Sequence, residues 1–376
     1  MKITRIRCYR PRRYNPTFNQ SDMVVAVETD EGLVGIGEGG SPDMLAQCGA
    51  VLIGEDPSRI EHLWQLLYRG YFYPAGREKL HALGALDLAL WDLKGKLLGC
   101  PVYQLLGGLT RHYIECYSTG YPWQGSIEET VRSCLEAGFR AWRTAVVDPG
   151  NGVFDARRAV TETHAHCQAV REAAGPEGDW AIDFHTRLDL ADSVRLCSLL
   201  EDLNPIFVED PLRSENPAAL ALLRGQVRVP IAVGEQFGDR WDLNELVERH
   251  LIDYARVTIP NVGGLTEFMK IAAMCETHTV GLVPHGTGPI SLAALVHALS
   301  VFPGPVLQEV GGAGPAIHPP HIGEGCDFRH GKLWPNDRTG LGVEFIPEGA
   351  TLIAEITEQH APIPVYHRPD GSLTNW

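Results

Sequence analysis

The chain has 376 residues, 44% of them hydrophobic, with a formal net charge of −15 at pH 7. This size suits a barrel of ordinary dimensions with a further domain, while the acidic surface disfavours nucleic acid and anionic membranes as partners, and no apolar run reaches bilayer length. The nine cysteines form no C-x-x-C pair, and the first residues of the sequence lack the apolar stretch typical of a signal peptide. We therefore expect a cytoplasmic protein with free thiols.

The first hundred or so residues predict a small α+β domain. Ile3–Tyr9 is a predicted strand, and Met23–Thr29 and Leu33–Ile36 flank the turn signal of an antiparallel hairpin. Helical patterns follow, one of them running through Leu80–Leu98 with apolar residues at helical spacing. This organisation is typical of a domain that covers a larger one.

From about residue 113, short apolar runs that end in polar residues alternate with helical patterns. Eight runs are predicted strands: Tyr113–Ser118, Ala141–Val146, Trp180–Asp183, Pro205–Glu209, Pro230–Glu235, Asp253–Thr258, Thr279–His285 and Pro305–Glu309. Eight such units favour a (β/α)8 barrel over an open sheet. We therefore expect an α/β protein with an α+β capping domain over residues 1–112, a barrel over 113–339, and a segment 340–376 that returns to the capping domain.

Three acids stand at the ends of three successive predicted strands. Asp183, Glu209 and Glu235 are equally spaced along the sequence, by about one βα unit, which would bring them to one level at the C-terminal mouth of the barrel. Three converging carboxylates repel one another unless a cation joins them. Oxygen ligands with space for water and substrate suit Mg²⁺. We expect these three residues to bind one Mg²⁺, the alternative being surface acids at loop starts.

Two histidines are expected on the same rim as potential catalytic groups. His185 comes two residues after Asp183, so on an extended chain the two side chains would face the same side. His285 ends the seventh predicted strand. Imidazole exchanges protons near neutral pH, although a histidine at a strand end can also be purely structural.

Two arginines and a further acid belong to the same ring of strand ends. Arg143 lies on the second predicted strand, Arg256 on the sixth, and Glu309 ends the eighth. A guanidinium can bind a substrate carboxylate or lower the proton affinity of a neighbour. Arg143 is a candidate catalytic residue, and Arg256, Glu309, His185 and His285 are candidate substrate-binding residues. Structural salt bridges are the alternative for this set.

Short motifs around these strand ends carry a resemblance to a known family. They are Asp183-Phe184-His185, Glu209-Asp210-Pro211, Ser214-Glu215-Asn216, Gly234-Glu235, Leu251–Arg256, Gly263–Thr266, His285-Gly286 and Leu307-Gln308-Glu309. Together they resemble the enolase superfamily, and within it the mandelate racemase-like acid-sugar dehydratases of the mannonate and galactonate dehydratase types. The resemblance covers nearly the whole chain.

The resemblance implies a reaction as well as a fold. Enzymes of this superfamily use Mg²⁺ and a lysine or histidine base to form an ene-diolate. Here it implies one Mg²⁺ per subunit and dehydration of an aldonate such as gluconate, galactonate or mannonate to a 2-keto-3-deoxy acid. His185 would protonate the leaving 3-hydroxyl, and His285 would act at the opposite face of the substrate. A homo-oligomer is expected. A racemase or cycloisomerase using the same step, or a weakly active or regulatory binder, remains open.

Several positions depart from the family pattern, among them Tyr117–Gly120, where a histidine is expected after the first strand. Arg143 stands where many relatives carry lysine, and no tyrosine occurs between Tyr121 and Tyr254 to act with it. Thr258 replaces the aspartate that usually supports the histidine corresponding to His285. Since one face lacks a partner base, we expect proton abstraction on the His285 side. The resemblance implies that this side serves substrates of 2R configuration, such as gluconate or galactonate, better than mannonate.

Two other features have weaker interpretations. His318, His321, Cys326 and His330 match no standard zinc spacing, and we expect their segment to be a loop covering the barrel mouth. A basic cluster near the N-terminus is a predicted solvated strand edge and consists of Arg5, Arg7, Arg10, Arg12 and Arg13. The alternative for its Arg12–Asn19 part is a loop that closes over substrate.

Overall fold

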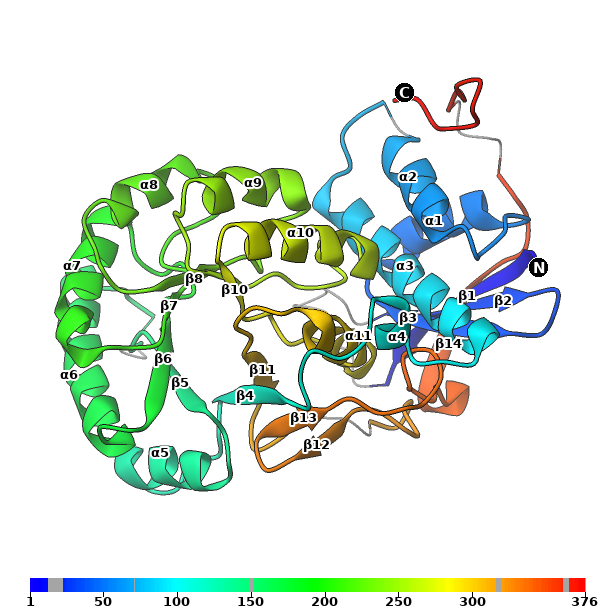
Figure 1. The fold of residues 1–376 in the computed structure, drawn as a ribbon. Coiled ribbons are helices and arrows are strands. Elements are labelled where there is room, and N and C mark those ends of the chain that lie inside the picture. The colour runs from blue at the N-terminus through cyan, green and yellow to red at the C-terminus, as the bar shows by residue number, and fades with distance from the viewer. Residues whose placement is uncertain (13–22, 71, 149–151, 316–318, 361–364, 376) are drawn as a thin grey trace.

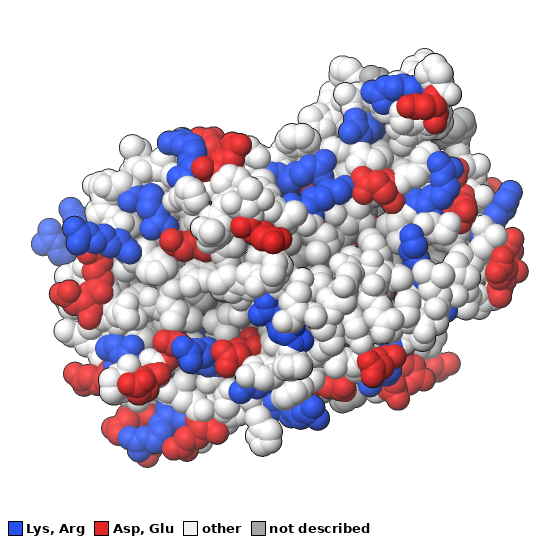
Figure 2. All heavy atoms as spheres, viewed as in Figure 1, with Lys and Arg blue, Asp and Glu red and all other residues white. Residues whose placement is uncertain are grey.

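The computed structural model describes residues 1–12, 23–70, 72–148, 152–315, 319–360 and 365–375. Figure 1 shows a ring of helices around parallel strands, next to a smaller body of antiparallel strands and helices. Within the described ranges, no helix has both the length and the apolar character required to cross a membrane. On the face drawn in Figure 2, basic and acidic side chains are interspersed rather than gathered by sign.

The smaller body is the expected α+β capping domain. Its sheet has the order β14-β1-β2-β3, formed by β1 (Ile3–Pro11), β2 (Val24–Thr29), β3 (Val34–Glu38) and β14 (Ala350–Ile356). The helices α1 (Pro42–Leu52), α2 (Ile60–Arg69) and α3 (Arg77–Leu98) pack on it through a shared hydrophobic core. The antiparallel pairing of β14 with β1 brings the C-terminal part of the chain back to this domain.

The larger body is a closed barrel of parallel strands. Its strands are β4 (Ile114–Thr119), β5 (Ala141–Ala145), β6 (Asp179–Asp183), β7 (Val208–Glu209), β8 (Ile231–Val233), β9 (Tyr254–Ala255), β10 (Gly281–Leu282) and β11 (Gln308–Gly311). Consecutive strands pair in parallel, β11 pairs with β4, and a parallel bridge from Leu282 to Val306 closes the circuit. These strands confirm the fold class, and each lies within or overlaps a predicted run.

Residues in or next to the barrel strands form a separate buried hydrophobic cluster, consisting of Tyr117, Ala141, Ala181, Phe207, Ala232, Val283 and Leu307. The surrounding helices are α5 (Ile127–Glu136), α6 (Ala156–Ala174), α7 (Leu190–Leu200), α8 (Ala218–Arg224), α9 (Arg240–Glu248), α10 (Leu265–Thr277) and α11 (Pro289–Val301), with the short α4 (Val102–Leu105) before the barrel. In α11 the run Ile290–Ser300 is buried throughout, because this helix lies between the barrel and the capping domain (Figure 1).

Two buried acids of the capping domain hold it to the barrel. Glu38 at the end of β3 accepts hydrogen bonds from the backbone N–H groups of Ile290 (3.1 Å) and Ser291 (2.9 Å), at the start of α11. Asp87 of α3 accepts from the N–H and hydroxyl of Thr266, at the start of α10. Each acid thus satisfies N–H groups that a helix start leaves unpaired and lies at the positive end of the helix dipole.

The segment expected to cover the barrel mouth is instead partly a hairpin at the other end of the barrel. The strands β12 (Asp327–Arg329) and β13 (Lys332–Trp334) pair with each other, and β13 pairs with the first residues of β4. The turn residues His330 and Gly331 both have positive φ, 48° and 64°, which suits a tight hairpin. For this stretch the mouth-covering prediction is wrong, because the residues on either side of His330-Gly331 pair as short strands that extend the sheet beside β4.

Three expectations lie wholly or partly beyond these observations. The described residues do not include His318. They also exclude Arg13–Asn19, which is the part of the predicted closing loop after Arg12. The domain boundaries after residues 112 and 339 remain predictions. His321 and Cys326 are buried.

Candidate active site

The strand ends bring the predicted acids together at the barrel mouth. Asp183 of β6 and Glu209 of β7 are direct partners in the parallel register. Glu209 is in turn the partner of Ala232, so Glu235 lies three residues farther along, beyond the end of β8. Gly234, the residue directly before Glu235, has a φ of 155°. A Cβ at this position would lie 2.7 Å from the backbone of Arg256. Glycine at this position therefore permits the close approach of the β8 end to the backbone at Arg256, directly before Glu235.

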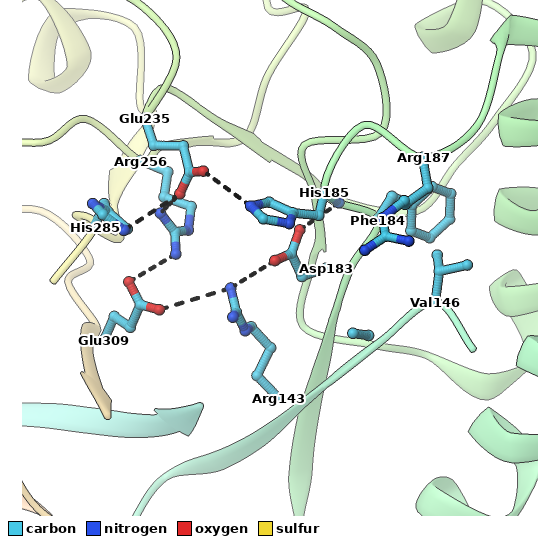
Figure 3. A pocket seen from close by; sticks show the side chains of 11 residues that line it. Arg143, Val146, Asp183, Phe184, His185, Arg187, Glu235, Arg256, His285 and Glu309 are labelled. Atoms are coloured by element: carbon cyan, nitrogen blue, oxygen red, sulfur yellow. Dashed lines mark hydrogen bonds and ion pairs between the residues drawn. The ribbon is translucent and has the colours of Figure 1, made fainter. Parts of the chain in front are cut away.

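A pocket at this mouth contains most of the predicted site (Figure 3). It is lined by Arg143, Ala145, Val146, Asp183, Phe184, His185, Arg187, Glu235, Arg256, His285 and Glu309. Glu209 is fully buried and contacts both Arg143 and Arg256. Arg187 and Phe184 were not among the predicted residues, although both belong to the turn that carries His185.

Arg256 is the electrostatic centre of the buried layer. It is 1% exposed, and its guanidinium lies 2.8 Å from Oε1 of Glu209, 2.7 Å from Oε2 of Glu235 and 2.7 Å from Oε2 of Glu309. Burial by itself disfavours its charge, but these carboxylates outweigh that cost and raise the pKa of Arg256 well above its usual value. Arg256 therefore remains protonated and joins three strand ends.

Arg143, like Arg256, lies close to three carboxylates of the site. Its Nη1 contacts Glu209 and lies 3.1 Å from Oδ2 of Asp183 and 3.7 Å from Oε1 of Glu309, while Nη2 donates to Thr119 Oγ1 at 2.6 Å. Burial is opposed by the nearby carboxylates, of which Glu209 contributes most, and the pKa of Arg143 is raised. A guanidinium held in this way does not act as a base.

The pKa values of the buried acids Glu209 and Glu309 are shifted in opposite directions, although both acids lie beside Arg143 and Arg256. Burial raises the pKa of Glu209 against the opposing influence of Arg256 and Arg143. Burial would also raise the pKa of Glu309, but Arg256, His285 and Arg143 overcome this and lower it to about 2. Glu309 Oε2 additionally accepts from the N–H of Gly286 at 2.8 Å. Glu309 is therefore ionised and fixed at the end of the eighth strand.

His185 reaches the pocket by a route that differs from the predicted one. The chain is not extended after Asp183, because His185 and Thr186 both have positive φ, 47° and 56°. The resulting turn is stabilised by Asp183 Oδ1, which accepts from the N–H of His185 at 2.6 Å. It places His185 Nε2 3.7 Å from Oε1 of Glu235. The expected position is reached, but through a left-handed turn that strand alternation does not predict.

His285 lies on the other side of Glu235. Its Nε2 is 3.6 Å from Oε2 of Glu235, and its Nδ1 is 3.0 Å from the hydroxyl of Thr258. Burial is the largest influence on its pKa and lowers it, so the neutral imidazole is favoured. Thr258 thus contacts His285 where an aspartate usually supports the corresponding histidine. Glu235 lies between the imidazoles of His185 and His285 (Figure 3).

The donor set fits a hard cation. Oε2 of Glu209 and Oδ2 of Asp210 are buried and have no hydrogen-bond partner among the described residues. Carboxylate oxygens of Glu209, Asp210 and Glu235 lie within 4.8 Å of one another, as expected where oxygen ligands converge on Mg²⁺. Asp210 was missed because an acid next to Glu209 should point away on a regular strand, whereas its φ of 39° turns the chain. Asp183 is not part of this cluster, and metal binding by Asp183 stays a prediction.

Comparisons with known proteins agree with this architecture. Residues 14–107 match the mandelate racemase/muconate lactonizing enzyme N-terminal domain, and residues 126–349 match the enolase C-terminal domain-like family. The D-galactonate dehydratases of Pectobacterium atrosepticum and Verminephrobacter eiseniae are 36% and 34% identical over 398 residues, covering 100% of each chain. The crystal structure of an enolase from Pantoea ananatis with bound D-gluconate and Mg is 27% identical, covers 93% of both chains and has a TM-score of 0.82. The chain therefore belongs to the enolase superfamily, in its mandelate racemase and muconate lactonizing enzyme branch.

Proposed function

We propose that the protein is a lyase that dehydrates an aldonate, such as gluconate or galactonate, to a 2-keto-3-deoxy acid through an ene-diolate. The observation that carries this proposal is the placement of His185 and His285 on either side of Glu235, at 3.7 and 3.6 Å. Two imidazoles flanking one carboxylate provide one group to take the C2 proton and another to assist departure of the 3-hydroxyl. The D-galactonate dehydratases among the relatives and the gluconate-bound enolase support the same substrate class.

The proposed proton abstraction belongs to His285. Its Nδ1 is directed by Thr258, so Nε2 is the nitrogen that faces the pocket and receives the proton. Burial lowers its pKa, which keeps it neutral and able to accept. On the opposite side Arg143 is held by carboxylates and cannot serve as a second base. Abstraction from one face only favours dehydration over racemisation.

The proposed acid is His185. It is about half exposed, 52% for its side chain, so it can be protonated from solvent between turnovers. It would give a proton to the departing hydroxyl as the C3–O bond breaks and the C2–C3 double bond of an enol forms. The enol then becomes the 2-keto product. Arg256 and Glu309 remain predicted substrate-binding residues, with Arg256 holding the acids beneath the substrate.

The proposed cofactor is one Mg²⁺ per subunit. Asp183, Glu209 and Glu235 would hold it, and Asp210 lies close enough to take part. When bound, it would neutralise the charge that develops on the substrate carboxylate and so lower the barrier to loss of the C2 proton. We further propose a cytoplasmic homo-oligomer, where the described cysteines, all free, would stay reduced.

The test is a screen of five- and six-carbon aldonates and aldarates with Mg²⁺ present, read as 2-keto acid formed and, in deuterated water, as exchange at C2. A dehydratase produces keto acid. A racemase or cycloisomerase exchanges the C2 proton without forming keto acid, and a regulatory binder shows neither signal. Keto acid from at least one acid sugar is the expected result, and its absence across the whole set would overturn the proposal.

A further inference from the structure

The turn that carries His285 leads directly into α11. Only Gly286 and Thr287 lie between His285 and Gly288, the residue that precedes the helix. Each residue adds only two soft backbone dihedral angles, so a turn this short passes a shift at the start of α11 on to the imidazole. The position of the proposed base therefore depends on what holds the start of this helix.

Carboxylates of both domains hold this turn. From the barrel, Oε2 of Glu309 accepts a hydrogen bond from the N–H of Gly286 at 2.8 Å. From the capping domain, Oε2 of Glu38 accepts from the N–H groups of Ile290 at 3.1 Å and Ser291 at 2.9 Å. Glu38 is 2% exposed and ends β3, which contacts α11 (Figure 1). The start of α11 is thus fixed by a residue that does not belong to the barrel.

Gly288 brings the turn itself against the carboxyl group of Glu38. A Cβ at Gly288 would overlap Oε1 of Glu38, although the φ of Gly288, −80°, is one that any residue adopts. Glycine is therefore needed here for close packing and not for its backbone conformation. Glu38 has little room to move away, because it is buried and its Oε2 is bound to the helix start.

Asp87 offers a comparison within the same molecule. It is also a buried acid of the capping domain, it accepts from the N–H of Thr266 at the start of α10 at 2.9 Å, and Gly264 packs against it. The turn before α10 contains neither proposed catalytic histidine, and the longer stretch of residues 259–263 separates Gly264 from Thr258. A role in joining the domains is shared by both acids, whereas an effect on His285 is expected of Glu38.

We propose that Glu38 is a positioning residue for the reaction, and that through it the capping domain sets the position of residues 286–288 and of the His285 imidazole. This proposal rests on the proposed function, because it takes His285 as the base. It extends the site to a capping-domain residue that does not line the pocket.

The first measurement follows the imidazole itself. Protein with isotopically labelled histidine is compared by NMR, and the signals of His285 are those that disappear in His285→Asn. In Glu38→Gln an NH2 group replaces one carboxylate oxygen and meets either the N–H groups of α11 or the backbone of Gly288, so the His285 signals should shift. Gly288→Ala should shift the same signals, because the new Cβ disturbs the contact from the other side.

Two substitutions serve as matched controls. Asp87→Asn makes the same change from acid to amide at the other join between the domains. Gly225→Ala adds a Cβ whose nearest atom would lie 3.5 Å away, at the end of α8. Both controls should leave the His285 signals unchanged.

The second measurement is the rate of C2 proton exchange in deuterated water with the best acid sugar, together with KM. Glu38→Gln should lower the exchange rate about tenfold, since a small misplacement of a reacting group costs up to about 100-fold. Its KM should change little, because Glu38 does not touch the pocket walls. Asp87→Asn should keep the wild-type exchange rate, and the urea midpoint of each variant shows how far its stability has changed.

The outcomes separate the role of Glu38 from the proposed function. Unchanged His285 signals in Glu38→Gln and Gly288→Ala, or shifted signals with a wild-type exchange rate, overturn positioning by Glu38 while the dehydratase assignment stands. Equal changes in Glu38→Gln and Asp87→Asn also overturn it, because they would reflect domain contact in general. A wild type that neither exchanges the C2 proton nor dehydrates any acid sugar overturns the proposed function, and the role of Glu38 with it.

Discussion

The hydroxyl of Thr258 lies 3.0 Å from Nδ1 of His285, and this contact orients the imidazole that we assign as the base. Replacing Thr258 by valine should lower kcat about 10- to 100-fold, by analogy with the loss of groups that orient metal-bound histidines, with a smaller effect on KM. Thr258→Ser should restore most of the rate because it retains the hydroxyl. Steady-state kinetics of the three proteins provide the check. Equal rates in the valine variant and the wild type would mean that His285 needs no orientation.

The substrate configuration should follow from the asymmetry of the two faces. Arg143 is bound to carboxylates and its pKa is raised by them, so in the proposed mechanism only the His285 face removes a proton. We expect D-gluconate or D-galactonate, which are 2R, to exceed D-mannonate in kcat/KM by at least about tenfold, or about 1.4 kcal/mol in barrier. Competition assays with pairs of aldonates measure this directly, and a preference for mannonate would contradict it.

Metal dependence should be absolute and should involve Glu209. Excess chelator should abolish activity, and Mg²⁺ should restore it. Glu209→Gln should also abolish activity and weaken Mn²⁺ binding, measured by electron paramagnetic resonance, because a neutral amide is a poor ligand for a hard cation. Glu245→Gln is the matched control, since Glu245 pairs with Arg249 on the exposed surface of α9. Circular dichroism should show that both variants are folded. Full activity in Glu209→Gln would rule out the metal assignment.

Stability should depend on pH through Asp87, which joins the capping domain to α10. Burial raises its pKa to about 7, against the opposing influence of its hydrogen bonds with Thr266. A carboxyl whose folded pKa is raised stabilises the fold most below its unfolded value, about 3.9, and this contribution is lost as pH rises toward 7. Asp87→Asn cannot ionise, so between about pH 5 and pH 8 its urea midpoint should fall less than that of the wild type. Parallel pH curves for the two proteins would contradict this.

The sequence predicted the parts of the molecule that follow from local pattern. Apolar runs ending in Asp183, Glu209 and Glu309 correctly indicated barrel strands, because parallel strands buried on both faces require such runs. Strands that follow one another along the chain are neighbours in the barrel. The side chains at their ends therefore lie close together as a consequence of the topology.

Other features depend on tertiary contacts that local pattern does not encode. The turn at His185 is fixed by its hydrogen bond to Asp183, and Asp210 enters the acidic cluster only through a positive φ. The acids Glu38 and Asp87 meet helix starts far along the chain. The β12–β13 hairpin, in contrast, had a recognisable signal in the short strands on either side of His330 and Gly331.

The central claim, that His285 removes the C2 proton and His185 assists departure of the hydroxyl, is tested most directly by proton exchange at C2 in deuterated water, followed by NMR in His285→Asn. The account predicts that this variant loses both exchange and dehydration, whereas His185→Asn keeps exchange and loses dehydration, so the two steps separate. Dehydration of a 2R aldonate at the wild-type rate by His285→Asn would contradict the account.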